Sequence, residues 1–274
     1  MIATFAPPAP AAPDLRRLWT DAPALTILSV ILILALIPLY AAMALDLREF
    51  QGDSPWLKPV KFHYALAIYA ATLAFFARYM PAATRASRSW RWFTGAVILA
   101  IIAECVWLTA AASLNTASHF NTDIPVFAAI YNLMGAFAVL LTSASLVMGL
   151  SIWRNPSTGL PQAVQLSIAL GLILTFVLTI ITAGYLSAAD GHFIGTPVTG
   201  AVLPILGWSR EVGDLRVAHF LSTHALHGLP LWGLVAARMG DVRGGVTLVW
   251  AGAAGYALLV AAVFLQALQG HPLI

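Results

Sequence analysis

The chain has 274 residues, of which 60% are hydrophobic and only 9% are charged, and its mean hydropathy is +0.86. This composition excludes an ordinary soluble domain and predicts a polytopic membrane protein. The formal net charge of +3 comes without any basic cluster interleaved with aromatic residues, so a nucleic-acid surface is excluded as well. The single cysteine, Cys105, excludes a disulfide framework within the chain.

The N-terminal stretch MIATFAPPAPAAPDLRRLWTDAP is rich in proline and alanine and lacks the layout of a cleavable signal peptide. We expect residues 1–24 to form a flexible tail and residues 25–270 to form one membrane domain. Seven apolar runs are long enough to span a bilayer. Backbone N–H and C=O groups find no hydrogen-bond partner in lipid, so such runs form helices, which satisfy these groups internally. The prediction is an all-α bundle of seven transmembrane helices at residues 25–45, 58–79, 92–113, 124–151, 162–186, 217–238 and 244–267.

Arginine and lysine are unevenly distributed over the predicted connections. The side that holds the N-terminus carries nine cations and three acids, whereas the opposite side carries five cations and seven acids. The positive-inside rule therefore places the N-terminus in the cytoplasm and the C-terminus outside. We expect a multi-pass protein of a bacterial inner membrane, with all seven histidines in its outer half.

The predicted sixth helix concentrates histidine in the segment GDLRVAHFLSTHALHGLP, where Asp214 is the expected N-cap. At about 100° per residue, His219, His224 and His227 share one face, which should look into the bundle because polar groups facing lipid are costly. Glu104, in the third helix, lies roughly 13 Å from the outer end at 1.5 Å per residue, close to the depth of His227. We expect Glu104 to contact His224 or His227, because a carboxylate in the bilayer needs a partner.

Two outer connections supply further polar groups. The segment SLNTASHFNTD contains His119 and Asp123, and the connection at about residues 187–213 contains His192. A connection of that length without evident secondary structure is usually functional. Its apolar middle, VTGAVLPILGW, is expected to dip back into the membrane as a lid.

The predicted second helix opens with SPWLKPVKF, which holds the only two lysines of the chain, Lys58 and Lys61. They lie three residues apart on one helical face, and two cations at a helix N-terminus form an anion site. The anion could be a lipid phosphate, a substrate carboxylate or a haem propionate. Arg210 and Arg216 are further candidates to hold propionates.

Four segments resemble motifs of an uncharacterised family of bacterial polytopic membrane proteins: SPWLKPVKF, SHFN, GHFIG and GWSREVGDLRVAHFLSTHA. They are spread over about residues 54–230. The resemblance carries no function with it. Residues such as Phe and Gln stand in that family at the positions of His63 and His227. The resemblance therefore favours the other four histidines of the loops and the sixth helix as ligands.

These residues predict an outward-facing site of histidines and carboxylates. The first hypothesis is a redox protein that binds haem b or a transition metal (zinc, copper or iron), all of which accept imidazole ligands. The candidate metal ligands are His119, His192, His219 and His224. A metal-dependent membrane hydrolase is an alternative, with Glu104 or Asp123 as the catalytic base. A proton-linked transporter or a structural subunit also stays open. Membrane lipid and a small-molecule or quinone substrate are the expected partners.

Overall fold

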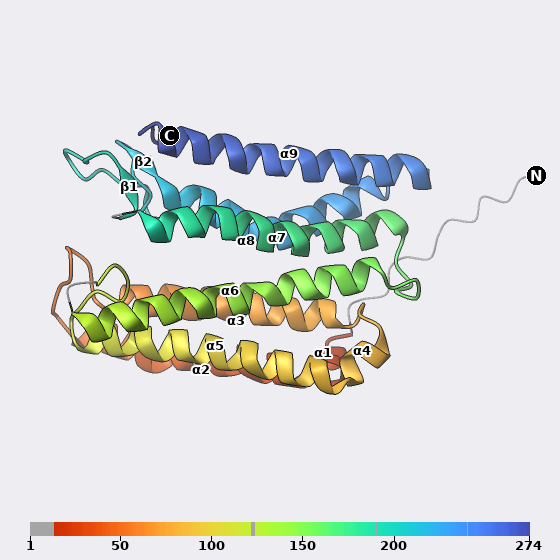
Figure 1. Ribbon diagram of the computed structural model, residues 1–274, viewed down its shortest axis with the longest axis horizontal. Coiled ribbons are helices and arrows are strands. Elements are labelled where there is room, and N and C mark those ends of the chain that lie inside the picture. The colour runs from red at the N-terminus through yellow and green to blue at the C-terminus, as the bar shows by residue number, and fades with distance from the viewer. Residues whose placement is uncertain (1–13, 122–123, 190, 240) are drawn as a thin grey trace, which may run out of the picture.

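The computed structural model describes residues 14–121, 124–189, 191–239 and 241–274, and these are mostly helical (Figure 1). Two short strands form an antiparallel pair in which Phe193 lies opposite Asp214. The helices and strands of the described residues are α1 (Arg16–Asp21), α2 (Pro23–Leu45), α3 (Leu57–Ala77), α4 (Ala82–Ala86), α5 (Arg88–Ser113), α6 (Pro125–Trp153), α7 (Gln162–Ala188), β1 (Phe193–Ile194), β2 (Gly213–Asp214), α8 (Leu215–Ala236) and α9 (Val242–Leu268).

Among the described residues, six helices are long and apolar enough to cross a membrane, namely α2, α3, α5, α6, α7 and α9. The protein is therefore a multi-pass integral membrane protein, and six of the seven predicted spans are confirmed to within a few residues. The remaining run, predicted at residues 217–238, does form a helix, α8, but it does not reach the same apolarity. Its three histidines and its hydroxyl side chains lower its hydropathy.

The long helices lie side by side in two groups (Figure 1). Helices α2, α3, α5 and α6 form one group, α7, α8 and α9 form the other, and α6 packs against α7. One end of the bundle, called here the strand end, carries β1, β2, the C-terminus and the connecting residues 46–56, 114–121 and 191–214. The opposite end carries α1 and α4 and is called the arginine end, after Arg78, Arg85, Arg88, Arg91, Arg154, Arg238 and Arg243.

Residues 16–21 form α1 and α2 begins at Pro23, whereas the sequence predicted a flexible tail over residues 1–24. Asp21 explains the difference, because it forms ion pairs with Arg17 one turn earlier, at 3.0 Å, and with Arg85 of α4, at 2.8 Å. These contacts fix α1 against the bundle. Helix α2 then begins at Pro23, whose φ suits the first turn of a helix.

Helix α8 is held to α7 by a close backbone approach and by a side-chain hydrogen bond. A Cβ atom at Gly171 of α7 would lie 2.9 Å from the carbonyl oxygen of Ala225 and 3.0 Å from Cδ of Pro230, so only glycine fits without adjustment. The backbone N–H of Leu226 donates to Oγ1 of Thr175 at 2.8 Å. Small residues and hydroxyl groups of this kind are the usual means of joining helices in lipid.

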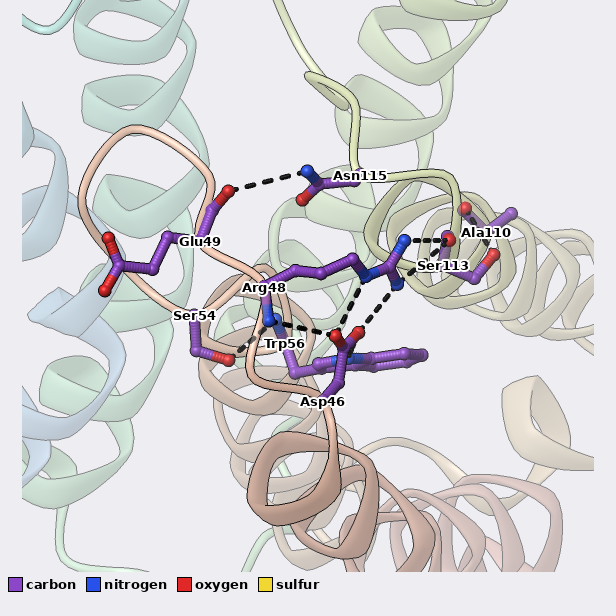
Figure 2. Close-up of polar contacts among 8 residues, drawn as sticks. All are labelled: Asp46, Arg48, Glu49, Ser54, Trp56, Ala110, Ser113 and Asn115. Atoms are coloured by element: carbon purple, nitrogen blue, oxygen red, sulfur yellow. Dashed lines mark hydrogen bonds and ion pairs between the residues drawn. The ribbon is translucent and has the colours of Figure 1, made fainter.

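The connection between α2 and α3 is fastened to α5 by a cluster around Asp46 (Figure 2). The Asp46 carboxylate accepts hydrogen bonds from Nε and Nη2 of Arg48, at 2.8 and 2.6 Å, and from Nε1 of Trp56, at 2.7 Å. Arg48 and Trp56 thereby hold the pKa of Asp46 well below its usual range. The Arg48 guanidinium also donates to the carbonyl of Ser113, at 3.2 Å, at the end of α5. The cluster therefore fixes the first turn of α3, where Lys58 lies, relative to α5.

Candidate functional site

Lys58, in the first turn of α3, meets His119 from the connection between α5 and α6. The Lys58 Nζ lies 3.1 Å from Nδ1 of His119, and Oγ of Ser118 lies 3.0 Å from the same nitrogen. An ammonium group can only donate, so Nδ1 accepts and the ring proton of a neutral His119 is on Nε2. Burial lowers the pKa of His119 to about 3, and the Lys58 charge acts in the same direction. His119 is therefore a neutral imidazole that presents an Nε2–H donor.

Glu104 lies in α5 with only 4% of its surface exposed. Among the described residues no ion pair or side-chain hydrogen bond engages it, and the Lys58 charge acts on it from a longer distance. The expected contact of Glu104 with a histidine of α8 is wrong for the described residues. The imidazoles of α8 bond elsewhere, since His227 Nε2 lies 3.0 Å from Oγ1 of Thr72 and His224 Nδ1 lies 2.7 Å from the carbonyl of Phe220.

Aromatic rings connect His119 to the second loop histidine, His192. The ring of Tyr131, from α6, lies 5.7 Å from that of His119, and Phe120 lies 5.6 Å from Tyr131 and 5.5 Å from His192. Phe62 of α3 lies 6.2 Å from His119 on another side. Phe120 has a φ of +59°, a conformation that bulky residues rarely adopt and that clusters at functional sites. Helices α3 and α6 and the connection between α5 and α6 thus place an aromatic wall around the two imidazoles.

His192 lies just before β1, and its position depends on the pairing of β1 with β2. Its carbonyl accepts a hydrogen bond from the N–H of Leu215 at 3.0 Å, directly after β2. Burial lowers the pKa of His192 to about 4, and the charges of Arg216 and Lys58 act in the same direction. Its Nδ1 atom is buried and has no hydrogen-bond partner among the described residues. His192 is therefore a second neutral imidazole with an unused polar atom.

Asp214 and Arg216 lock the 189–214 connection onto the start of α8. The predicted N-cap is confirmed, because the Asp214 carboxylate accepts the N–H of Arg216 at 3.0 Å. The same carboxylate accepts the N–H of Ser209 at 3.0 Å and two bonds from the Arg216 guanidinium, at 2.9 and 2.6 Å. Arg216 also donates to the Gly207 carbonyl at 2.5 Å. Its guanidinium is thus used to hold the loop, whereas the sequence suggested that it binds a propionate.

The apolar middle of this connection is organised by Glu211. Its carboxylate accepts the backbone N–H groups of Val198, Thr199 and Ala201 and the hydroxyl of Thr199. The bonds from Thr199 and the two other N–H groups lower the pKa of Glu211 to about 2. The side chain of Ile205, in the stretch expected to dip into the membrane, is 94% exposed. Arg210, which directly precedes Glu211, is also exposed.

The three histidines of α8 have three different environments. His224 stacks on Phe220, with ring centroids 3.9 Å apart, and His227 reaches across to α3 through Thr72. The Nδ1 atom of His219 is buried without a hydrogen-bond partner in the described part of the chain. His227, which the family resemblance ranked below the others, is therefore the one that joins the two helix groups.

The four predicted metal ligands fall into two places. His119 and His192 lie together at the strand end, and His219 and His224 lie along α8. Over residues 14–121, 124–189, 191–239 and 241–274, no group of three or more His, Cys, Asp or Glu side chains could hold a metal ion. Asp123 lies outside the described residues. Lys61 is exposed, and only Lys58 of the two lysines enters the cluster.

The side chains that converge at the strand end are Lys58, Glu104, His119, His192, Phe120 and Tyr131, called here the Lys58 site. Tyr131 could not be found from the sequence, because nothing near it in the chain marks it as polar or functional. It enters through the fold, with its hydroxyl bonded to the Ser187 carbonyl of α7 at 2.9 Å. No protein-family model, curated protein or solved structure matches the chain.

Proposed function

We propose that this integral membrane protein binds the head group of a quinone at the Lys58 site. The observation that carries the proposal is the 3.1 Å contact of Lys58 with a neutral His119, beside the buried Glu104. A quinone ring has apolar faces, which suit an aromatic wall, and two carbonyl oxygens, which accept hydrogen bonds. The Nε2–H of His119 and the Lys58 ammonium are donors of the required kind.

Reduction of a quinone to the quinol takes two electrons, which a separate redox partner would have to supply, and two protons, one on each carbonyl oxygen. Quinone chemistry therefore also needs a proton source next to these oxygens. Glu104 and Lys58 are the proton-holding groups of the site, and both are partly or fully withdrawn from solvent. General acid–base groups act most efficiently when they lie within hydrogen-bond reach of the reacting atom. In this proposal, Glu104 and Lys58 exchange protons with the bound head group, and His119 orients it.

The four segments that resemble motifs of a bacterial membrane-protein family support the proposal of a common site. SPWLKPVKF supplies Lys58, SHFN supplies His119 and Phe120, and GHFIG supplies His192. The longest motif, GWSREVGDLRVAHFLSTHA, supplies Asp214, which fixes the loop of His192. Segments far apart in the chain thus meet in one place, as expected if the motifs serve one ligand.

We further propose that α8 is a seventh membrane crossing and that the arginine end faces the cytoplasm of a bacterium. Helix α8 runs beside α7 and α9 (Figure 1), and its 22 residues give a length of roughly 33 Å at 1.5 Å per residue, enough for the hydrocarbon core. The positive-inside rule orients the arginine end inward. The Lys58 site then lies on the outer side of the membrane.

Quinone binding can be tested by fluorescence quenching during titration of the purified protein with a short-chain benzoquinone. Trp107 is a built-in reporter, because its Nε1–H donates to the Ser118 carbonyl at 2.8 Å, next to His119. We expect Lys58→Met to weaken binding at least about tenfold, the value of one charge-assisted hydrogen bond. Lys61→Met, the matched loss of an exposed lysine, should change the affinity less than about twofold. Equal affinities of the two variants would reject the site.

A metal or haem centre is the second candidate, and the buried, unpartnered Nδ1 atoms of His192 and His219 favour it. A buried imidazole nitrogen without a hydrogen-bond partner is expected where the histidine is a ligand of a metal ion or of a haem iron. An absorption spectrum in the oxidised and reduced states, with elemental analysis of the same sample, tests this candidate. A Soret band or one metal ion per chain that is lost in His192→Ala would support it. Neither signal after reconstitution with haem and with metal would contradict it.

A further inference from the structure

We propose that the arginine end binds the phosphate group of an anionic phospholipid in a hollow at the start of α5. The open hollow has a volume of about 440 Å³ and is lined by Arg88, Arg91 and Trp92. The two arginines are three residues apart, so their side chains leave the helix on the same face. This place lies at the end of the bundle opposite to the Lys58 site and is independent of it.

The guanidinium groups at this end are not equally free. Arg85 forms an ion pair with Asp21 at 2.8 Å, and the Nε–H of Arg78 donates to the Phe75 carbonyl at 3.0 Å. Within the part of the chain that the structure describes, no ion pair or side-chain hydrogen bond engages Arg88 or Arg91. Residues 1–13 contain no aspartate or glutamate that could neutralise them. The two positive charges at the hollow are therefore free to bind an anion.

The anion is held by side chains rather than by the helix terminus. Ser87 caps α5, and its Oγ accepts the N–H of Trp90 at 3.1 Å. The planar guanidinium group offers paired N–H donors that match two phosphate oxygens at once. Two such groups on one face favour phosphate over a carboxylate, because phosphate presents more acceptor oxygens.

Exposed tryptophans place this hollow at the level of lipid head groups. The indole of Trp92 is 81% exposed, and those of Trp19, Trp153 and Trp250 are 53%, 45% and 47% exposed on α1, α6 and α9. Trp153 and Trp250 contact each other with ring centroids 6.1 Å apart. Exposed tryptophan is enriched where the hydrocarbon core meets the head groups. Trp92 therefore brings the hollow to the depth at which lipid phosphates are concentrated, which favours a lipid over free phosphate.

The test is lipid binding by the purified full-length protein in detergent, counted by native mass spectrometry during titration with phosphatidylglycerol. We expect Arg88→Gln with Arg91→Gln to weaken binding about thirtyfold, since each arginine near an anionic lipid contributes about fivefold. The matched control is Arg154→Gln with Arg243→Gln, which removes two exposed charges from the same end outside the hollow. This control should weaken binding less than about threefold. Equal losses of lipid affinity in the two double variants would overturn the proposal, because the loss would then reflect the summed positive charge of the arginine end and not the hollow.

Two further arms separate the alternatives. Inorganic phosphate at the concentration of the lipid should leave lipid binding unchanged, and full displacement would assign the hollow to a soluble anion instead. Arg88→Lys with Arg91→Lys keeps both charges but removes the paired donors. Weaker binding by this variant than by the wild type supports recognition by the guanidinium groups. Wild-type affinity in the lysine variant would refute it.

Discussion

Asp214 is the residue whose loss we expect to detach His192 from the Lys58 site while the helices remain folded. It is 1% exposed, and its carboxylate accepts four hydrogen bonds, from the N–H groups of Ser209 and Arg216 and from the Arg216 guanidinium. Asp214→Ala removes all four bonds. Because β2 ends at Asp214 and pairs with β1, the change acts directly on the strand that follows His192.

The magnitude follows from the contacts. Loss of a helix N-cap costs about 1 kcal/mol, and removal of one partner from a buried ion pair costs about 3–5 kcal/mol. The Arg216 side chain is 31% exposed, so water can solvate it in part and the lower end of this range applies. We therefore expect Asp214→Ala to destabilise the 189–214 connection by about 3 kcal/mol. That change corresponds to roughly hundredfold faster amide exchange in the connection.

The assay is hydrogen–deuterium exchange of the detergent-purified protein, followed peptide by peptide, together with the quinone titration. Exchange should accelerate over residues 191–214 and stay unchanged in α2 to α7, while quinone affinity falls. Asp241→Ala is the matched control, because Asp241 caps α9 at the arginine end through one hydrogen bond, to the N–H of Gly244 at 2.7 Å. It should cost about 1 kcal/mol and leave the 189–214 connection and quinone binding unaffected. If Asp214→Ala behaves like Asp241→Ala, the locking role of Asp214 is refuted.

Two other consequences of the structure can be measured. His119 and His192 have folded pKa values of about 3 and about 4, below the ordinary 6.5, so the unfolded loops bind more protons and their stability falls as the pH drops below 6.5. Amide exchange in residues 114–121 and 191–214 should then be faster at pH 5 than at pH 7.5, after correction for the intrinsic effect of pH on exchange. The double variant His119→Gln with His192→Gln should lose this extra exchange at pH 5. If the extra exchange persists in that variant, protonation of the two histidines is not its cause. Gly171→Ala should lower the thermal unfolding midpoint, at a cost of about 1–3 kcal/mol, because the added Cβ would press on the Ala225 carbonyl. Gly184→Ala, where the added Cβ meets open space, should leave the midpoint unchanged. A lower midpoint for Gly184→Ala than for Gly171→Ala would disprove the close approach of α7 and α8.

Features that depend on a single helix could be predicted from the sequence. Apolar runs predicted six confirmed spans, and the pattern at Asp214 predicted the N-cap of α8. Lys58 was predicted, together with Lys61, to bind an external anion at the start of α3, and the structure places its ammonium against His119. The spans and the cap follow from local residue types, because hydropathy and capping act within one turn or one span.

The partner of Glu104 could not be predicted, because depth along a helix says nothing about which helices are neighbours. Glu104 and His227 were matched by depth, yet α5 packs against α3 and α6 while α8 packs against α7 and α9. Equal depth brings two side chains together only when their helices face each other. His227 instead finds the hydroxyl of Thr72 on α3, a residue with no distinguishing feature in the sequence.

The Lys58 charge acts on the buried Glu104 although no ion pair joins the two side chains in the described residues, and this determines how loss of either group affects the protein. In a low-dielectric site, removal of one member leaves the other uncompensated, whereas removal of both can be neutral for stability. Lys58→Met alone therefore leaves Glu104 without its cation, and part of any lost quinone binding would reflect disturbed packing. The double change Lys58→Met with Glu104→Gln leaves no charge unpaired and should restore the thermal midpoint toward that of the wild type. Since it also removes the ammonium donor and the proton-holding carboxylate, quinone binding should stay weak, which separates the role of these groups in binding from their role in stability.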